Sequence, residues 1–415
     1  TSTLSLSGTN AYTGATILRA GTLAITNNAG LGTSAGGVTV ANGATLDLQG
    51  VTVGAEAITL NGGTLSASTG TSSLSGVVSL TSASSVGGAG NLTLSGAVTS
   101  NGNGLALFGT GSKTISNTSN TLSTIATDSG VGALSVVNNA ALSIGQVTTG
   151  GSTYNGIHST GTVSVSTSTG DLTVSQNVVT TSNASSYATP ALMLSAGSLT
   201  AAGTATGGDV VLSGSPTLSV GSGGVALIYS GYATTSNGIS LVGNLSSNTS
   251  YYQEYNQSSS YAPSSGSGYY GLFREAPTIV YLLPVAGQSS TYGTAPTSLD
   301  YCYSSSAASC VNVAYTGVPS TSQSFSLANS AVTSSVSVAS GVSGSVALSG
   351  PAAVASGFVA TTDAGTYALT LNPSLALTGY VFSRGNAVNY TVAAKTVVIS
   401  NTARTTTYDG VSSYA

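Results

Sequence analysis

Apolar and hydroxyl side chains alternate over long runs in the first 245 residues of the chain. Val, Leu and Ile occupy every second position and Ser or Thr fills the positions between them, as in TLSLSG (3–8), GVTVANGATLDLQG (37–50) and GTVSVSTSTGDLTVSQNV (161–178). A period of two is typical of β-strands with one buried face, and the Gly and Asn residues between the runs mark turns. Apolar residues at helical spacing are absent almost everywhere, so the sequence predicts an all-β protein.

One short phrase occurs three times near the beginning of the chain. GTLAI (21–25) is followed after 23 residues by ATLDL (44–48) and after a further 19 by GTLSA (63–67). A strand that recurs at this period indicates a solenoid, in which each coil covers the inner face of its neighbour. We therefore expect residues 1–245 to form a right-handed parallel β-helix of roughly a dozen coils, about 60 Å long at about 4.8 Å per coil.

Residues 246–275 break this rhythm and are rich in Tyr, Ser and Gly. We interpret them as a long loop or linker whose tyrosines supply contact area while Ser and Gly supply flexibility, as in adaptable binding loops. Alternatively, the segment covers the open end of the rod, which would otherwise expose a strand edge. The tyrosines that we name as candidate binding residues are Tyr251, Tyr252, Tyr255, Tyr261, Tyr269 and Tyr270, and Tyr229 and Tyr232 could adjoin them.

The pattern changes again at about residue 276, where Pro becomes more frequent and the runs lengthen. TIVYLLP (278–284) and DAGTYALTLNPS (363–374) are examples of the longer runs, and turn signals separate them. Strands of this kind over residues 276–400 predict a small antiparallel β-domain, sandwich-like in architecture. TTTYDG (405–410) echoes STYGT (290–294), so we expect residues 401–415 to begin a second, truncated copy of the same domain.

Charge is scarce in this chain of 415 residues. Charged side chains make up 4% of it and the net charge is −4. Six basic residues cannot neutralise a row of phosphates, so we expect no nucleic-acid partner. No apolar run reaches the roughly 18 residues of a transmembrane helix, so we expect no membrane insertion by this segment. We expect the six cations, which do not cluster, to be solvated or to protect strand edges: Arg19, Lys113, Arg274, Arg384, Lys395 and Arg404.

The two cysteines, Cys302 and Cys310, stand eight residues apart. A neighbouring pair in a chain with no other thiol favours a local disulfide and an oxidising compartment, and the alternative is two unpaired thiols. A structural zinc site needs four ligands, and the chain has only one His, so zinc is not expected. The Gly-Gly-x-Gly-x-Asp repeat that binds calcium between coils is also missing, so we predict no metal and no cofactor.

Residues 3–32 carry a more specific pattern, a strand followed by Asn-x-Tyr-Thr-Gly-x-Thr and then Ala-Gly-Thr-Leu. This pattern resembles the passenger-associated repeat of autotransporters and large exported adhesins. The residues that match it are Asn10, Tyr12, Thr13, Gly14, Thr16, Ala20, Gly21, Thr22 and Leu23. Later coils, such as those in residues 161–178, are similar to filamentous-haemagglutinin-like β-helix coils.

The second region resembles the extracellular repeat known as the MBG or YDG domain. The shared features are YGTAP (292–296), DAGTY (363–367), Asn389-Tyr390, and the closing strand AAKTVVI (393–399) before the next Tyr-Asp-Gly. The insertion that holds the two cysteines departs from the family pattern. The resemblance implies a bacterial surface or secreted protein, extracellular or associated with the outer membrane, that acts in adhesion or matrix formation with its repeats as a stalk.

The side chains that could perform catalysis are few. His158 is the only His, and no G-x-S-x-G motif accompanies it, so we expect a solvated surface residue. Paired carboxylates of a polysaccharide-cleaving β-helix would need to lie roughly 5–10 Å apart across coils. Asp47 with Glu56, or Asp171 with Asp209, are the pairs that could meet in this way.

The leading hypothesis is a non-enzymatic adhesin segment, in which the rod carries a binding surface and the tyrosines contact a glycan or protein on a host or neighbouring cell. Self-association into a filament or biofilm matrix is a second hypothesis, because nearly uncharged β-rods repel one another little. A polysaccharide-degrading β-helix is the third.

Overall fold

The computed structural model describes residues 2–204, 206–232, 251–263, 268–275, 278–296, 298–310, 323–326, 333–334, 343–351, 358–376 and 380–399. Within these ranges the chain forms strands β1 to β39 and no helix, which confirms the predicted all-β class. In particular, the described residues contain no helix with the length and hydropathy of a membrane span. The chain divides into two compact units, Thr1–Thr278 and Ile279–Ala415. We call the first unit the coil stack.

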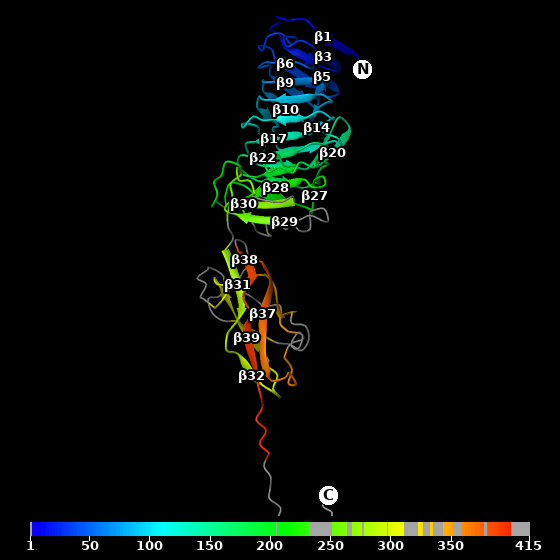
Figure 1. The fold of residues 1–415 in the computed structure, drawn as a ribbon. Coiled ribbons are helices and arrows are strands. Elements are labelled where there is room, and N and C mark those ends of the chain that lie inside the picture. The colour runs from blue at the N-terminus through cyan, green and yellow to red at the C-terminus, as the bar shows by residue number, and fades with distance from the viewer. Residues whose placement is uncertain are drawn as a thin grey trace, which may run out of the picture. The chain divides into compact units, whose positions relative to one another are not determined.

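Two ten-stranded parallel sheets run through the coil stack. Figure 1 shows strands of these sheets stacked one above another. Sheet A consists, in spatial order, of β1 (Thr3–Leu6), β3 (Gly21–Ile25), β5 (Ala44–Gln49), β8 (Thr64–Thr69), β11 (Ser84–Gly87), β14 (Gly104–Phe108), β16 (Thr124–Thr127), β18 (Leu142–Ile144), β23 (Leu172–Val174) and β26 (Val210–Leu212). Sheet C consists of β29 (Tyr251–Tyr255), β30 (Gly268–Phe273), β28 (Val225–Ser230), β25 (Leu192–Ser195), β22 (Val163–Thr167), β17 (Leu134–Asn138), β15 (Lys113–Ile115), β12 (Asn91–Leu94), β9 (Thr71–Leu74) and β6 (Thr52–Val53).

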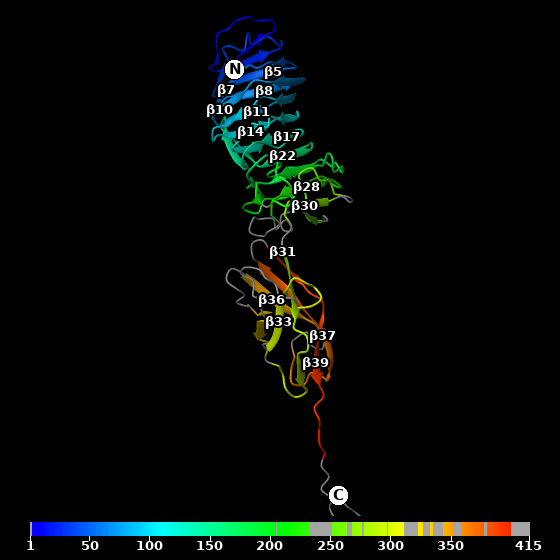
Figure 2. The same ribbon diagram turned by 90° about the vertical axis from the view of Figure 1, so that its left-hand side faces the viewer.

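Shorter sheets complete the coils. Sheet B contains β13 (Val98–Thr99), β10 (Val78–Ser82), β7 (Ile58–Asn61), β4 (Val38–Ala41) and β2 (Thr16–Leu18), and Figure 2 shows several of these strands beside sheet A. Sheet D contains β21 (Ile157–Ser159), β24 (Val178–Thr180) and β27 (Leu218–Ser219). One antiparallel hairpin, β19 (Gln146–Thr149) with β20 (Ser152–Asn155), interrupts the coils.

The chain visits sheets B, A and C in turn, so that β7, β8 and β9 make one coil and β10, β11 and β12 make the next. The repeated phrase of the sequence corresponds to β3, β5 and β8. These strands are neighbours in sheet A, where Leu23 pairs with Leu46 and Leu46 with Leu65. The parallel sheets and the in-register repeats are consistent with a β-helix or solenoid-like fold.

Alternation along each strand separates the interior of the coils from their surface. Val86 and Leu107 extend the column of Leu23, Leu46 and Leu65, and each of these side chains is at most 5% exposed. The residues beside them point outward and form a column of hydroxyls along sheet A, namely Thr3, Thr22, Thr45, Thr64 and Ser85. Each buried Leu stabilises the fold by about 1.5–3 kcal/mol relative to exposure, so the stack depends on keeping this register.

Buried amide side chains link successive coils at the strand ends. The Val98 N–H donates to Asn120 Oδ1 at 2.7 Å, and Asn120 Nδ2 donates to the Val137 carbonyl at 2.8 Å. Asn138 Oδ1 accepts from the Leu122 N–H at 2.7 Å. Both amides are fully buried, so each satisfies backbone groups that would otherwise lie unpaired inside the protein.

Lys113 and Arg274 are buried, so the expectation that the cations are solvated or protect strand edges is wrong for these two. Lys113 is 1% exposed, and its Nζ donates to the carbonyls of Gly88 at 2.9 Å and Gly111 at 2.6 Å. Arg274 is 2% exposed, and its guanidinium donates to the carbonyls of Ala196 and Gly208. The turns of neighbouring coils supply these carbonyls, so each cation ties coils together.

The predicted loop or linker over residues 246–275 contains two strands of the coil stack instead. β30 pairs in parallel with β28, and β29, which precedes β30 in the chain, pairs with the outer side of β30. Alternation was obscured here because both faces of β30 are covered and all six of its residues are buried. Residues 246–250 lie outside the described residues.

The described residues of the second unit form two sheets. One has the order β34 (Gln323–Ser326), β33 (Ser298–Ser304), β31 (Thr278–Pro284) and β38 (Tyr380–Arg384). The other has the order β32 (Ser289–Thr291), β39 (Val388–Ala393), β37 (Gly365–Ala376), β36 (Ser343–Ser349) and β35 (Thr333–Ser334). The β32–β39 pair is parallel, whereas β31–β33 and β37–β39 are antiparallel.

Both sheets of the second unit contribute to one hydrophobic core. Leu282 and Tyr301 from the first sheet and Leu369 and Tyr390 from the second belong to the same buried cluster. The units divide after Thr278, where the sequence predicts a boundary after residue 275. The predicted second copy over residues 401–415 lies outside the described residues.

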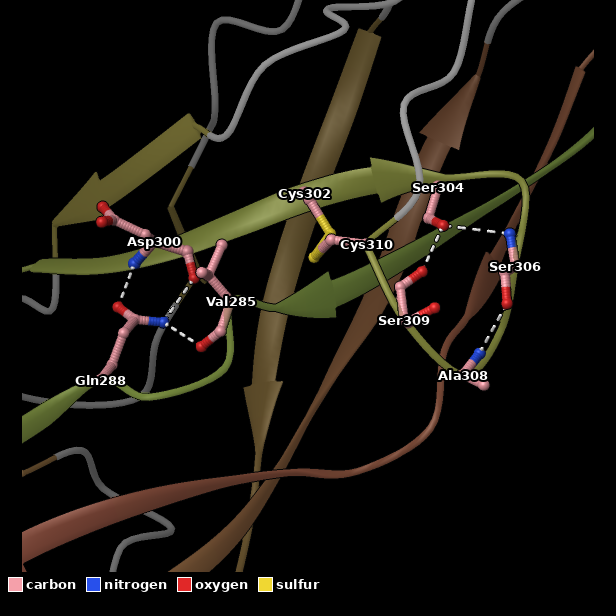
Figure 3. The surroundings of a disulfide bond; sticks show 9 residues. All are labelled: Val285, Gln288, Asp300, Cys302, Ser304, Ser306, Ala308, Ser309 and Cys310. Atoms are coloured by element: carbon pink, nitrogen blue, oxygen red, sulfur yellow. Dashed lines mark hydrogen bonds between the residues drawn. A yellow bond between two sulfur atoms is a disulfide. The ribbon is translucent and has the colours of Figure 1, made fainter.

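The predicted disulfide is present in the second unit. Cys302 in β33 is bonded to Cys310, and their Cα atoms are 5.9 Å apart (Figure 3). Within the loop that the bond closes, Ser304 Oγ donates to the Ser309 carbonyl at 2.7 Å and accepts from the Ser306 N–H at 3.0 Å. The loop is therefore fixed both covalently and by its own hydroxyls.

Burial of Lys113 predicts a pH dependence of the stability of the coil stack. Burial lowers the pKa of its ammonium from 10.5 to about 8, and the Asp128 carboxylate opposes this shift. Between these two values the unfolded chain holds a proton that the folded chain has lost, so the free energy of unfolding rises with pH across this window. We expect the free energy of unfolding of the wild type minus that of Lys113→Met to increase by about 1–3 kcal/mol from pH 8 to 10.5.

Urea unfolding of both proteins at several pH values measures this difference. Because both chains carry the same remaining titratable groups, only the difference between their free energies of unfolding is informative. A difference that stays constant or shrinks with pH would contradict the account of Lys113.

Candidate functional site

The structure separates the six candidate tyrosines into buried and surface groups. Tyr269 is fully buried in the main core, where its hydroxyl accepts from the Val220 N–H at 3.0 Å. Tyr270 is 2% exposed. Both side chains pack inside the fold, so neither presents a free surface to a ligand in this structure. The side chain of Tyr251 lies outside the described residues.

The remaining candidates lie at or near the surface. Tyr252 is 43% exposed, and Tyr255 and Tyr261 are half-buried. Tyr255 stacks on Phe273 with ring centroids 5.7 Å apart, and the Tyr261 hydroxyl donates to the Glu254 carboxylate. Among the predicted tyrosines whose side chains the structure describes, Tyr252 is therefore the most exposed.

Tyr252, Tyr270 and Tyr187 form an aromatic cluster on the outer face of sheet C. The rings of Tyr252 and Tyr270 stack with centroids 4.9 Å apart, and Tyr187 meets Tyr270 edge-on at 5.6 Å. The hydroxyls of Tyr187 and Tyr270 lie 3.1 Å apart, within hydrogen-bond distance. Burial, followed by this hydrogen bond, raises the pKa of Tyr270 well above its usual range. The cluster anchors the loop that carries Tyr187 to the sheet.

A groove of about 260 Å³ lies beside this loop on the outer face of sheet C. Its floor follows one outward column across four coils, because Thr114 pairs with Ser135, Ser135 with Ser164, and Ser164 with Met193. Ala188, Thr189 and Pro190 of the loop form one wall. The full lining is Ser112, Thr114, Ala133, Leu134, Ser135, Thr162, Val163, Ser164, Ala188, Thr189, Pro190 and Met193.

The loop reaches its position through contacts at both of its ends. The Val225 N–H donates to the Ala184 carbonyl at 2.9 Å, and Ser185 forms an antiparallel bridge with Pro190. Together with the Tyr187 contact, these interactions hold the wall of the groove in place without a ligand.

None of the residues that line the groove carries a charge. Six of them have hydroxyls, which can each donate and accept hydrogen bonds, and the others offer apolar surface. Such a lining suits a neutral ligand with both polar and apolar faces, such as an uncharged glycan or a stretch of neutral polypeptide. It provides no ion pair for a phosphate or a sulfate.

The sequence alone does not reveal the groove, because the residues that line it are far apart in the chain. Thr114, Ser135 and Ser164 come together only when the register of sheet C is known. A partial signal is available in TSNASSYATPA (181–191), which interrupts the alternation between two strands and contains a Tyr and a Pro. Interruptions of this kind form loops on the surface of a solenoid.

Three of the candidate carboxylates, Asp47, Asp171 and Asp209, accept hydrogen bonds from protein donors. Asp47 accepts from the N–H and the hydroxyl of Ser68, and Asp171 Oδ1 accepts from the backbone N–H of Asp209 at 2.9 Å. Asp209 Oδ1 in turn accepts from Ser230 Oγ at 3.0 Å. Glu56 is 4% exposed, and burial raises its pKa. His158 lies half-buried in β21.

Across the described residues, no three His, Cys, Asp or Glu side chains gather in a way that could hold a metal ion. Asp171 and Asp209 do lie in adjacent coils, as the sequence suggested. Asp171 Oδ1 accepts from the backbone N–H of Asp209 in the next coil, so this carboxylate links the two coils.

The aromatic cluster generates a stability prediction. Replacing the buried Tyr270 by Ser removes a ring packed between two others, which we expect to cost about 3 kcal/mol. The same change at the more exposed Tyr252 should cost less than about 1 kcal/mol. Chemical unfolding followed by near-ultraviolet circular dichroism compares the two variants, and equal losses would contradict the assignment of Tyr270 to the core.

Comparison with known proteins identifies no family or function for this chain. The chain matches no family model, no curated protein and no solved structure.

Proposed function

We propose that this chain is a segment of a bacterial surface or secreted adhesin. In this proposal the coil stack is a right-handed parallel β-helix that presents a neutral binding surface, and the second unit is a sandwich-like spacer of the MBG or YDG kind. The observation that carries the proposal is the uncharged groove built on the rigid outer face of sheet C. The resemblances noted in residues 3–32 and 292–410 support an extracellular location.

The groove suits adhesion because the scaffold holds it in place before any ligand arrives. Its floor belongs to four strands that are paired in register, and its wall is anchored through Tyr187. A preformed site avoids the entropic cost of ordering loops on binding. The partner would be a neutral glycan or protein on a host or neighbouring cell, and nucleic acid is disfavoured because the lining has no cation.

Substitutions on one outward column test the groove. We expect Ser135→Arg, which places a long cation on the groove floor, to reduce attachment of the purified chain to a responsive cell or glycan-coated surface at least tenfold. Ser73→Arg is the matched control, because Ser73 lies on the same column of sheet C outside the groove. Attachment is measured by surface plasmon resonance or by retention of fluorescent protein.

Wild-type attachment should also persist in 0.5 M salt, because a neutral site has no ion pair to screen. Equal attachment by wild type and Ser135→Arg, or loss of attachment in salt, would contradict the groove as the adhesive surface. Attachment to no surface at all would contradict the adhesin proposal itself.

Self-association is a second candidate function, and an exposed apolar segment favours it. Val397, Val398 and Ile399 are 75%, 83% and 88% exposed. The closing strand expected over residues 393–399 is wrong beyond Ala393, where β39 ends, because residues 394–399 belong to no sheet in the described structure. Three consecutive exposed apolar residues on an unpaired segment can add to a sheet edge of another copy.

Sedimentation velocity at rising protein concentration tests this second function. We expect wild type to form dimers or larger species and Val398→Lys to shift the onset to at least tenfold higher concentration. Val77→Lys, at an exposed Val of the coil stack, is the control. A wild-type chain that stays monomeric at all concentrations would contradict self-association.

A further inference from the structure

The β19–β20 hairpin leaves the coil path on the side of the coil stack formed by sheet A. Its strands pair from Gln146 with Asn155 to Thr149 with Ser152. The two residues of its turn, Gly150 and Gly151, have φ values of 58° and 78°, which glycine adopts without steric cost. A Gly-Gly turn with positive φ at both positions matches the right-handed twist of a two-residue hairpin. The segment VTTGGSTY (147–154) therefore contains a hairpin signal.

The hairpin folds back over the outer face of sheet A instead of extending into solvent. Val147, which is 3% exposed, packs with Ala106 and Ala126. A Cβ at Gly104 would lie 2.8 Å from a methyl of Val147, so the absence of a side chain there makes room for the hairpin. Near the turn, Thr149 Oγ1 donates to the Ala83 carbonyl at 2.8 Å. The outward column of sheet A has Thr or Ser up to Ser85 and then Ala106 and Ala126, where the hairpin covers it.

A pocket of about 360 Å³ opens beside the hairpin, over coils that retain their hydroxyls. Thr45, Thr64 and Ser85 lie in one outward column of its floor. Phe108 and Tyr154 supply the aromatic lining. The complete lining is Thr45, Thr64, Ser66, Ser85, Phe108, Thr149, Gly150, Ser152 and Tyr154.

Phe108 reaches this pocket because its neighbour on the adjacent strand has no side chain. Gly87 pairs with Phe108, and a Cβ at Gly87 would lie 2.6 Å from Phe108 Cδ1. The ring therefore occupies the place of the missing side chain and forms a wall next to Ser66. Tyr154 comes from β20, so the two rings belong to segments that only the hairpin brings together.

We propose that this pocket binds a neutral sugar residue of a glycan. Sugar rings have apolar C–H faces that pack on aromatic side chains and hydroxyls that both donate and accept hydrogen bonds. The pocket offers both kinds of surface, and none of its lining residues is charged. Its volume falls within the roughly 300–1,000 Å³ of small-molecule sites, and its open side admits a residue within a chain.

The floor hydroxyls favour a sugar over a peptide. The backbone groups of the floor strands are already engaged in sheet A, so they offer little to a peptide backbone that needs ordered donors and acceptors. Within the described residues, the hydroxyls of Thr45, Thr64 and Ser85 have no protein hydrogen-bond partner. They remain available to sugar hydroxyls, each of which matches either a donor or an acceptor.

This inference rests on the proposed extracellular role for its biological setting, but it concerns a different sheet from the groove. The two therefore fail separately. Ser135→Arg should leave sugar binding at the hairpin unchanged, and a chain that attaches to surfaces without binding any sugar would overturn this inference alone.

Saturation-transfer NMR on the full chain tests the pocket with three neutral probes, tri-N-acetylchitotriose, cellotetraose and maltotetraose. We expect at least one probe to bind with millimolar affinity or better. Tyr154→Ala should weaken that binding at least tenfold, whereas Tyr154→Phe, which keeps the ring, should change it less than threefold. Thr64→Arg should also abolish binding, because it fills the pocket from the floor without altering the hairpin.

The control is Thr153→Ala, because Thr153 is an exposed hairpin residue that does not line the pocket. β-Sheet circular dichroism checks that each variant folds. Absence of binding by all three neutral probes would overturn the proposal. Full binding by both Tyr154→Ala and Thr64→Arg would overturn it as well, as would equal weakening in Thr153→Ala.

Discussion

The parallel pairing of each coil with the next is the interaction on which the rest of this structure depends. It pairs the backbone groups of neighbouring strands in the stack and, because side chains alternate, it also decides which residues enter the core. Slipping one strand by one residue would move Leu46 outward and Thr45 inward. All of the buried columns therefore stabilise the same strand register. Hydrogen bonds made by the side chains of Asn120, Asn138, Lys113 and Arg274 stabilise it further at the turns.

The same register creates the outer surface. Outward-facing positions form columns that cross the strands, and a groove or pocket lies where a loop covers part of such a column. On sheet C the loop anchored by Tyr187 leaves the groove, and on sheet A the β19–β20 hairpin leaves the pocket that contains Tyr154. Both sites combine hydroxyls from regular coils with a wall from an irregular segment. A regular scaffold thus supplies a neutral platform, and insertions give it local shape.

Local sequence predicted the strands well and their spatial neighbours only in part. Alternation and the recurring GTLAI-type phrase predicted the class and the stacking of β3, β5 and β8, since both depend on residues close in sequence. The prediction of a loop or linker over residues 246–275 was wrong because β30 is buried on both faces and shows no alternation. In addition, β29 precedes β30 in the chain but lies beyond it in the sheet, on the side away from β28. The burial of Lys113 was not predicted because the carbonyls that accept its hydrogen bonds come from turns of different coils. The groove needs the register of several distant strands, which a single segment does not reveal.

Distances along one outward column of sheet C test the central claim most directly. Spin labels at Thr52 and, in separate variants, at Thr114, Ser135 or Ser164 span three, four and five successive strand pairs. Double electron–electron resonance should give backbone separations of about 14, 19 and 24 Å after correction for the label, an equal step of about 4.8 Å per coil. Separations that do not increase in equal steps, or that decrease from one variant to the next, would contradict the in-register stack.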